Sequence, residues 1–285
     1  MPDIEEEFIR DCWYVAGWSG DFTHALTPLR ILDEPIVVFR TEAGVPAALE
    51  DACPHRKLPL SKGRLTGETV ECGYHGLTFD CSGTCVRAPT QDGPPPALTV
   101  RSYPVEDRWG ILWIWMGDAN KANPDKIFEI PNYDNPAWGR TQGGSMDIAC
   151  HYLYVVDNLL DPSHVAWVHV SSFAGAGTGN LPLDLEKLDD GIIVSRWVMD
   201  APPPPYYEPI LPFSGNCDRK QHYECRLPST AINMSVYTRA GTGGDNDNLP
   251  DDAFLNISYN FMTPVDADNT RYFWFQHRNS DPDNQ

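Results

Sequence analysis

The first part of the chain alternates short hydrophobic runs with turn residues. Residues 8–50 and 70–118 contain runs rich in β-branched and aromatic side chains, bounded by Gly, Pro, Asn and Asp. Such spacing is typical of a small all-β unit. The run 111–115, with sequence ILWIW, has the composition of a buried strand. We therefore expect a β-sandwich that closes near Asp118 and is followed by a polar link.

The pattern changes in the second half of the chain. Residues 147–170 have helical character, whereas residues 222–240 and 254–277 return to strand-like runs. Loop residues dominate three further segments, 176–184, 201–206 and 241–252. The pattern predicts a sheet with helices against it, so the fold class is α+β. We expect two domains, 1–118 and 119–285.

Two Cys and two His lie between the predicted strands of the first half. They occur in Cys53-Pro54-His55 and in Cys72-Gly73-Tyr74-His75, a C-x-H and a C-x-x-H pair. A [2Fe-2S] cluster can use this set, with two thiolates on one iron and two imidazoles on the other. A structural zinc site is the alternative, but zinc frameworks usually open with C-x₂₋₄-C and close with H-x₃₋₅-H. One Cys and one His in each arm therefore favour the cluster.

A second group of polar residues lies in the predicted helix, in the pattern D-x-x-H-x₄-H at Asp161, His164 and His169. On a straight helix the two His would lie about 140° apart, too far to share a metal ion. Pro162 favours the first turn of a new helix, so we expect a kink at Asp161. A bent helix, or one ending before His169, would direct both imidazoles to one metal. The alternative is a pair of ordinary helix histidines with an N-capping Asp.

These motifs resemble those of Rieske non-haem iron oxygenases. The sequences CPHR at 53–56, CGYHG at 72–76 and DNLLDPSH at 157–164 carry the resemblance, which extends to WYVAGW near the start and to 263–279. The chain is most similar to the vanillate and dicamba O-demethylase group. The resemblance implies an all-β Rieske domain followed by an antiparallel-sheet catalytic domain of the helix-grip type.

The resemblance also implies roles for individual residues. A [2Fe-2S] cluster would be held by Cys53, His55, Cys72 and His75, and a mononuclear Fe(II) by His164 and His169. Asp161 matches a residue that bridges the two centres across a subunit contact, with a hydrogen bond to an iron-bound His on each side. Asn158 matches a polar residue near the iron. The implied assembly is a homotrimer in which one subunit's cluster serves its neighbour's iron.

The third iron ligand of the family is an Asp on a C-terminal helix. That position falls beyond Gln285, because Asp281 and Asp283 come too soon after the Arg278-Asn279 that matches the family. We therefore expect either that a C-terminal segment is missing from the chain or that water completes the iron site.

Two polar residues on otherwise apolar strands are candidates for substrate contacts. Asn233 lies in AINMSVY and Asn260 in ISYNFMTP. An inward-facing amide needs a partner, which is either a substrate or the neighbouring strand. Tyr206, Phe273 and Trp274 are candidates for the wall of an aromatic pocket or for the core.

Composition narrows the choice of partners. A net charge of −19 argues against binding to nucleic acid or to an anionic membrane. No apolar stretch approaches the length of about 18 residues needed to span a bilayer. The acidic N-terminus is unlike a secretory signal, so we expect a cytoplasmic protein. In such a compartment Cys81 and Cys85 are expected to be free thiols.

Together these observations predict the terminal oxygenase of a multicomponent system. Its electrons would come from NAD(P)H through a separate reductase or ferredoxin, since the chain has no nucleotide-binding fingerprint. The expected reaction is O₂-dependent monooxygenation of a small aromatic substrate, with O-demethylation of a methoxy-aromatic acid as the specific form. The alternatives are ring or side-chain hydroxylation, or a Rieske electron carrier with an inactive second domain.

Overall fold

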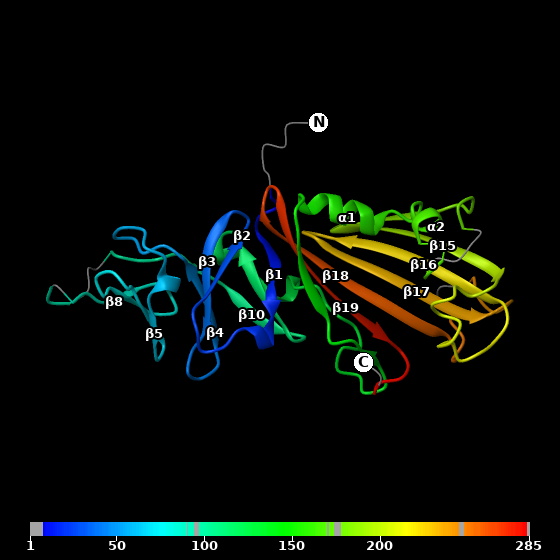
Figure 1. Ribbon diagram of the computed structural model, residues 1–285, viewed down its shortest axis with the longest axis horizontal. Helices are drawn as coiled ribbons and strands as arrows, with labels where there is room; N and C mark the ends of the chain where they lie inside the picture. Colours follow the sequence, from blue (N-terminus) through cyan, green and yellow to red (C-terminus); the bar gives the residue numbers. More distant parts are fainter. Residues whose placement is uncertain are drawn as a thin grey trace. The chain divides into compact units, whose positions relative to one another are not determined.

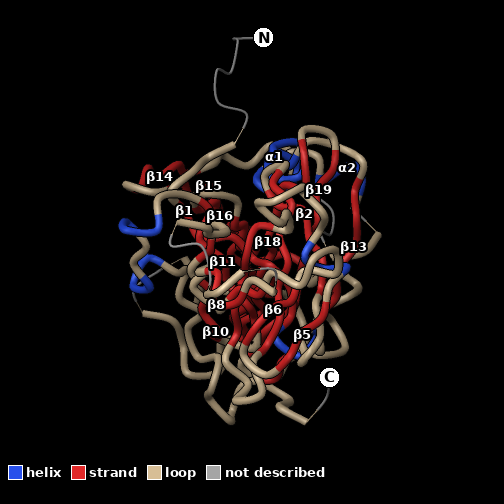
Figure 2. The backbone as a smooth tube through the Cα atoms, turned by 90° about the vertical axis from the view of Figure 1, so that its left-hand side faces the viewer, coloured by secondary structure: helices blue, strands red, loops and turns tan. Residues whose placement is uncertain are grey.

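Strands are the main regular elements of the described residues, and the helices there are few and short (Figure 2). The computed structural model describes residues 8–89, 91–93, 97–169, 171–173, 178–244 and 248–283. The chain divides into two compact units. The first comprises Met1–Glu129, Ile148–His151 and Thr263–Arg271, and the second Ile130–Asp147, Tyr152–Met262 and Tyr272–Gln285.

The first unit is built from three small antiparallel sheets. One has the order β1-β11-β10, the next β2-β3-β4-β9 and the third β5-β6-β7-β8. Their strands are β1 (Cys12–Trp18), β2 (Thr27–Ile31), β3 (Glu34–Arg40), β4 (Pro46–Glu50), β5 (Arg64–Thr66), β6 (Thr69–Glu71), β7 (Thr78–Phe79), β8 (Cys85–Arg87), β9 (Ser102–Tyr103), β10 (Val105–Arg108) and β11 (Ile111–Met116). Four short 3₁₀ helices accompany them, at Ser19–Asp21, Leu60–Lys62, Ala119–Lys121 and Pro124–Lys126.

Strand β11 forms the centre of the first sheet. All six of its side chains are buried, including both Trp113 and Trp115. The Trp115 ring packs edge-on against Trp13 of β1, with 5.5 Å between ring centroids. Full burial of a large apolar side chain contributes about 1.5–3 kcal/mol, so this run stabilises the unit as its composition predicted. The all-β prediction for this part of the chain is confirmed.

The second unit contains a large antiparallel sheet. Eight strands have the order β12-β19-β18-β17-β16-β15-β14, with β13 also paired to β19. They are β12 (Gly139–Arg140), β13 (Gly144–Ile148), β14 (Asp184–Leu188), β15 (Gly191–Ala201), β16 (Cys217–Arg226), β17 (Thr230–Arg239), β18 (Phe254–Asp266) and β19 (Asn269–Arg278). Two short helices, α1 (Tyr152–Leu160) and α2 (Val165–Val168), lie along one face of the sheet (Figure 1).

The strand register gives the helix-covered face of the sheet its polar character. Gln221 of β16 lies opposite Ser235 of β17, which lies opposite Asn256 of β18. Tyr223, Asn233 and Ser258 form the next row in the same way. Side chains two residues apart on a strand point to the same face. Two polar rows therefore face the helices.

Part of the predicted helix is a strand. Residues 144–148 form β13 and pair with β19, and the helix begins only at Tyr152. Pairing with a neighbouring strand overrode the local pattern there. Strands β14 and β15 were not predicted either. Strand β14 is exposed at nearly every position, so it lacks the alternation of buried and exposed side chains that indicates a strand.

Two expectations about the whole chain can be compared with the structure. None of the eight cysteines, all of which lie within the described residues, forms a disulfide, so Cys81 and Cys85 are not joined to each other. Among the described residues, every helix is too short or too polar to cross a membrane.

Candidate metal centres and cavity

The two Cys-His segments of the first unit form loops with the same backbone hydrogen bonds. Each Cys carbonyl accepts from the amide four residues later, and each Cys amide donates to the carbonyl five residues later. The distances are 2.8 Å (Lys57 N to Cys53 O), 2.9 Å (Cys53 N to Leu58 O), 3.0 Å (Gly76 N to Cys72 O) and 2.8 Å (Cys72 N to Leu77 O). The loops precede β5 and β7, so the small sheet β5–β8 positions both.

The fourth residue after each Cys turns the chain back in the left-handed conformation. Lys57 has φ +57° and Gly76 has φ +71°. A side chain at Gly76 would also come within 2.9 Å of Pro89 Cγ. Glycine is therefore required in the second loop for both its backbone conformation and its close packing.

The four side chains of these loops differ in exposure. Cys53 and Cys72 are each 2% exposed, whereas His55 and His75 are exposed, with 4.7 Å between their ring centroids. Burial raises the pKa of the Cys53 thiol, while the backbone amide of His55, hydrogen-bonded to it, acts in the opposite direction. Two neighbouring thiols and two neighbouring imidazoles fit the donor set of a [2Fe-2S] cluster with mixed ligands.

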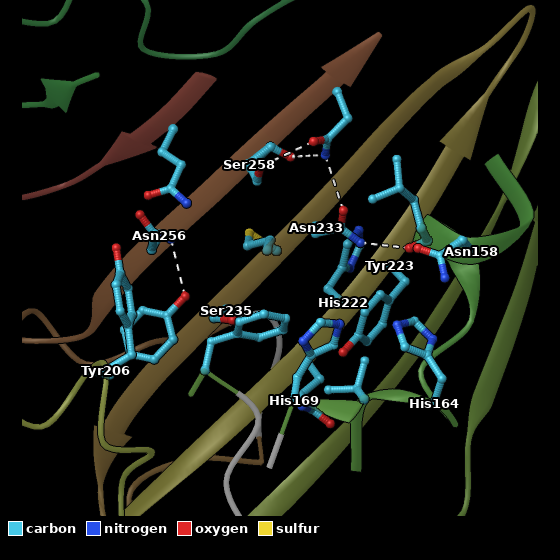
Figure 3. A pocket seen from close by; sticks show the side chains of 18 of the residues that line it. Asn158, His164, His169, Tyr206, His222, Tyr223, Asn233, Ser235, Asn256 and Ser258 are labelled. Carbon is cyan, nitrogen blue, oxygen red and sulfur yellow. Dashed lines mark hydrogen bonds between the residues drawn. The ribbon is translucent and has the colours of Figure 1, made fainter. Parts of the chain in front are cut away.

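The second centre lies where α1 gives way to α2. Helix α1 ends at Leu160, and α2 occupies only Val165–Val168, with His164 before its first residue and His169 after its last. The helix is thus interrupted at Asp161, as predicted. The imidazoles at the two ends of α2 approach each other, with 5.4 Å between ring centroids (Figure 3).

Asp161 holds this turn through several hydrogen bonds. Its Oδ1 accepts from the amide and the hydroxyl of Ser163, at 2.7 and 2.5 Å, and its Oδ2 lies 3.2 Å from His164 Nδ1. Burial opposes ionisation, but the hydrogen bonds from Ser163 and His164 lower the pKa of Asp161. An ionised Asp161 accepts a hydrogen bond from the Nδ1–H group of His164, and the Nε2 atom of that tautomer carries the lone pair that binds a metal.

A buried arginine that the sequence did not reveal ties the same turn to the sheet. Arg196 of β15 donates to the carbonyl of Pro162 at 3.3 Å and to the carbonyl of Thr178 at 2.6 Å. Its Nε donates to Gln221 Oε1 at 2.7 Å. Arg196 therefore fixes the position of the turn that carries the two histidines.

The two histidines open onto a cavity of about 340 Å³ between the helices and the sheet. Figure 3 shows Asn158, His164 and His169 on one side of it and Tyr206 and Asn256 on the other. Further lining residues include Leu159, Val165, Phe173, Tyr207, Gln221, His222, Tyr223, Asn233, Met234, Ser235, Ser258, Asn260, Tyr272 and Gln276. In the described part of the chain, no three His, Cys, Asp or Glu side chains are arranged to hold a single metal ion. The pairs Cys53/Cys72 and His55/His75 still suit a [2Fe-2S] cluster, because each iron of such a cluster needs only two protein ligands.

The two asparagines singled out in the sequence both line this cavity. Asn260 Nδ2 donates to Asn233 Oδ1 at 3.1 Å, and Tyr272 donates to Asn260 Oδ1 at 2.6 Å. Asn233 Nδ2 donates to the carbonyl of Leu159 at 2.8 Å. The inter-strand hydrogen bond is therefore present, and it fixes both amides at the cavity wall.

The aromatic candidates fall in different places. Tyr206 lines the cavity, whereas Phe273 is buried in the core and Trp274 stacks on Tyr272 at 5.0 Å. Sequence reasoning missed the polar residues Gln221, Ser235, Asn256 and Ser258. For Ser235, Asn256 and Ser258 the signal was polar side chains at alternate positions among the apolar residues of β17 and β18. Gln221 lies on β16, which is polar at most positions and gives no such signal.

Comparison with known proteins agrees with both centres. Residues 12–104 match the Rieske [2Fe-2S] domain, and residues 148–285 match the vanillate O-demethylase oxygenase C-terminal domain. An iron-sulfur subunit of the toluene-4-sulfonate monooxygenase system of Comamonas testosteroni is 35% identical, over 98% of this chain and 81% of the relative. The vanillate O-demethylase oxygenase subunit of a Pseudomonas species is 34% identical, over 96% of this chain and 78% of the relative.

A solved structure shows the same fold over nearly the whole chain. Dicamba monooxygenase bound to 3,6-dichlorosalicylic acid superimposes with a TM-score of 0.88 at 31% identity, covering 97% of this chain and 80% of that protein. Another structure of dicamba monooxygenase contains non-haem iron. The Rieske match, the catalytic-domain match and relatives of this identity together establish that the chain belongs to the Rieske non-haem iron oxygenases, as an oxygenase component with a [2Fe-2S] cluster and a mononuclear iron.

Proposed function

We propose that this oxygenase component catalyses monooxygenation of a small aromatic acid, and that the reaction is O-demethylation of a methoxy-aromatic substrate. The cavity beside His164 and His169 carries the proposal. Its volume of about 340 Å³ suits one substituted ring, and its walls combine aromatic side chains with a few amides and hydroxyls. Sites for small organic ligands have this mixture.

The residues of the two centres have distinct proposed roles. The [2Fe-2S] cluster would be held by Cys53, His55, Cys72 and His75, and the mononuclear iron by His164 and His169. When bound, the cluster supplies single electrons and the mononuclear iron activates dioxygen. Asp161 fixes the tautomer of His164 and Arg196 holds the turn, while Asn158 presents a polar group beside the two histidines.

The proposed reaction on the substrate is that of two relatives, the vanillate and dicamba O-demethylases. One oxygen atom of O₂ enters a C–H bond of the methoxy group, and two electrons and two protons reduce the other to water. The resulting hemiacetal loses formaldehyde and leaves a phenol. Hydroxylation of a methyl group or ring is the second candidate, because the 35% identical relative belongs to a toluene-4-sulfonate monooxygenase system.

Two partners are part of the proposal. The relatives are named as subunits or components of larger systems, so electrons would come from a separate reductase or ferredoxin. The chain would also assemble as a homotrimer. Trp167 and Val168 of α2, which are 82% and 68% exposed beside the Asp161 turn, offer an apolar surface for such a contact.

Product analysis tests the reaction. The iron-loaded protein, supplied with NADH and a generic reductase, would be incubated with a panel of methoxybenzoates and with toluene-4-sulfonate. We expect formaldehyde and the matching phenol in equal amounts from at least one methoxybenzoate. A hydroxylated product without formaldehyde would favour the second candidate. If the protein contains two irons per chain and oxidises none of the aromatic acids, it is better described as an electron carrier, and the proposal is contradicted.

Exchange of one proposed cluster ligand has a spectroscopic consequence. A thiolate in place of a neutral imidazole adds negative charge to the cluster, so the His75→Cys variant is expected to have a lower reduction potential and a shifted visible spectrum. Redox titration followed by absorbance and EPR measures both. A variant with the spectrum and potential of the wild type would show that His75 is not a ligand.

A further inference from the structure

We infer that Gln221 selects substrates whose ring carries a hydrogen-bond acceptor, such as a carboxylate or a sulfonate, through the side-chain NH₂ group that it presents to the cavity. The inference rests on the proposed function, since it assigns the chemical class of the molecule that enters the same cavity. Gln221 is one of the residues that line this cavity, so a ligand there can contact it.

The orientation of the Gln221 amide follows from its neighbour. Arg196 of β15 lies directly opposite Gln221 in the strand register, and 2.7 Å separate Arg196 Nε from Gln221 Oε1. An arginine side chain has only donors, so the atom of Gln221 that faces it must be the oxygen. An amide turned the other way would place two donors against each other. The nitrogen of Gln221 is therefore held away from Arg196.

In the described part of the chain, no acceptor meets the Nε2 atom of Gln221. The residue is only 6% exposed, and the hydrogen bond of its side chain is the one with Arg196. Nε2 still has accessible surface, unlike the enclosed nitrogen atoms of Arg219, and the space beside it is the cavity. Buried polar groups are normally hydrogen-bonded, so a substrate can supply the acceptor that the protein lacks.

Arg196 makes the same wall electropositive. Its acceptors among the described residues are neutral oxygens, those of the Gln221 amide and of the Pro162 and Thr178 carbonyls. The described residues that line the cavity include no Asp or Glu. A charged donor polarises the amide that accepts from it, which strengthens the bond that the N–H groups of this amide can donate. The wall at Gln221 therefore favours an acceptor, best an anionic one, over a cationic donor.

The position of Gln221 suits the far end of a substrate ring. The strand register places Gln221 opposite Ser235, which lies opposite Asn256. Figure 3 shows Ser235 and Asn256 further from His164 than Tyr223, which is two residues from Gln221 on β16. Residues two apart on a strand are separated by about 7 Å. A ring that places its reacting group beside the histidines can therefore present a substituent at its other end to Gln221.

Binding of three planar probes of similar size tests the inference. Titration calorimetry on the iron-loaded protein would compare 4-methoxybenzoate, an anionic acceptor, with 4-nitroanisole, a neutral acceptor, and 4-methoxybenzamidine, a cationic donor. The wild type is expected to bind both acceptors at least about tenfold more tightly than the amidine. The net charge of −19 would by itself favour the amidine, so this order would reflect the local group.

Gln221→Glu is the matched variant. A carboxylate in place of the amide still accepts from Arg196 Nε but has no N–H group to offer, so the contact with Arg196 is kept. The variant should bind 4-methoxybenzoate at least about tenfold more weakly and 4-nitroanisole about threefold more weakly, and it should prefer the amidine. Its melting temperature and iron content should equal those of the wild type.

Gln276→Glu separates the lost donor from the added charge. Gln276 also lines the cavity, but it lies on β19, the third strand from β16. The same charge at this position should leave the affinity for neutral 4-nitroanisole within about twofold of the wild type. If both variants weaken the binding of 4-nitroanisole equally, the added charge explains the effect and the inference is overturned.

Failure of the inference differs from failure of the proposed reaction, because binding needs neither electrons nor dioxygen. A wild type that binds the amidine as tightly as the two acceptors, or that binds none of the probes, overturns the inference without any variant. A Gln221→Glu protein that loses iron and binds all three probes equally weakly identifies a structural residue and also overturns it. Acceptors that bind through Gln221 but are never oxidised support the inference and contradict the proposed reaction.

Discussion

Replacement of Asp161 by asparagine is expected to lower turnover by about 10- to 100-fold, the usual effect of removing a group that orients a metal-bound histidine. The carboxylate accepts from His164 Nδ1 and from the amide and hydroxyl of Ser163. An amide side chain keeps the shape but loses one acceptor oxygen and the negative charge. The ring of His164 then loses the partner that fixes its tautomer, and the proposed bridge between the two centres is broken.

Metal analysis alongside steady-state turnover checks this result. Both the [2Fe-2S] cluster and the mononuclear iron should remain in the Asp161→Asn variant, so the lost activity reflects transfer between centres and not lost metal. Ser163→Ala is the matched control, because it removes one donor to Asp161 and leaves the contact with His164 in place. Wild-type turnover in Asp161→Asn would exclude the bridging role.

Replacement of His169 by alanine is expected to abolish turnover while the cluster remains. His169 follows the last residue of α2, and burial together with the nearby His164 lowers the pKa of its ring. The imidazole is therefore neutral at pH 7, which is the form that binds a metal. With this ligand lost, the iron content should fall from about three to about two atoms per chain.

Iron and acid-labile sulfide assays, with EPR of the reduced cluster, distinguish the two centres. The variant should keep the sulfide content and cluster signal of the wild type. His24→Gln provides a control for loss of a histidine, since His24 lies in the first unit, is exposed, and its Nδ1 lies 2.8 Å from the backbone carbonyl oxygen of Arg40. Three irons per chain in His169→Ala would show that His169 does not hold the metal.

The parts of the two centres that lie in short segments could be predicted from the sequence. In each cluster loop, local hydrogen bonds and one left-handed residue bring a Cys and a His together within five positions. The interruption at Asp161 was likewise predictable, because Pro162 cannot continue the hydrogen bonding of α1. Buried strand β11 followed from composition alone. In all these cases the decisive interactions are between near neighbours in the sequence.

The rest of the site depends on contacts between distant residues. Arg196 and Pro162 are 34 positions apart, and Asn233 and Leu159 are 74 apart. Arg219 is buried on the helix-covered face of the sheet, although its neighbours in the sequence of β16 are polar. The exposed strand β14 has no pattern to detect, and it is held by pairing with β15. Such features arise from the register of a long sheet, which a single sequence does not specify.

The three hydrogen bonds that Arg196 donates have a consequence for redesign of the substrate range. Gln221 is an obvious position to vary in a mutant library, since its side chain faces the ring-binding space. The side-chain oxygen of Gln221, however, accepts a hydrogen bond from Arg196 Nε–H, and the other nitrogens of Arg196 donate to the backbone carbonyls of Pro162 and Thr178. Libraries directed at Ser235 or Met234 would reshape the space without disturbing this support, whereas changes at Gln221 would alter selectivity and metal retention together.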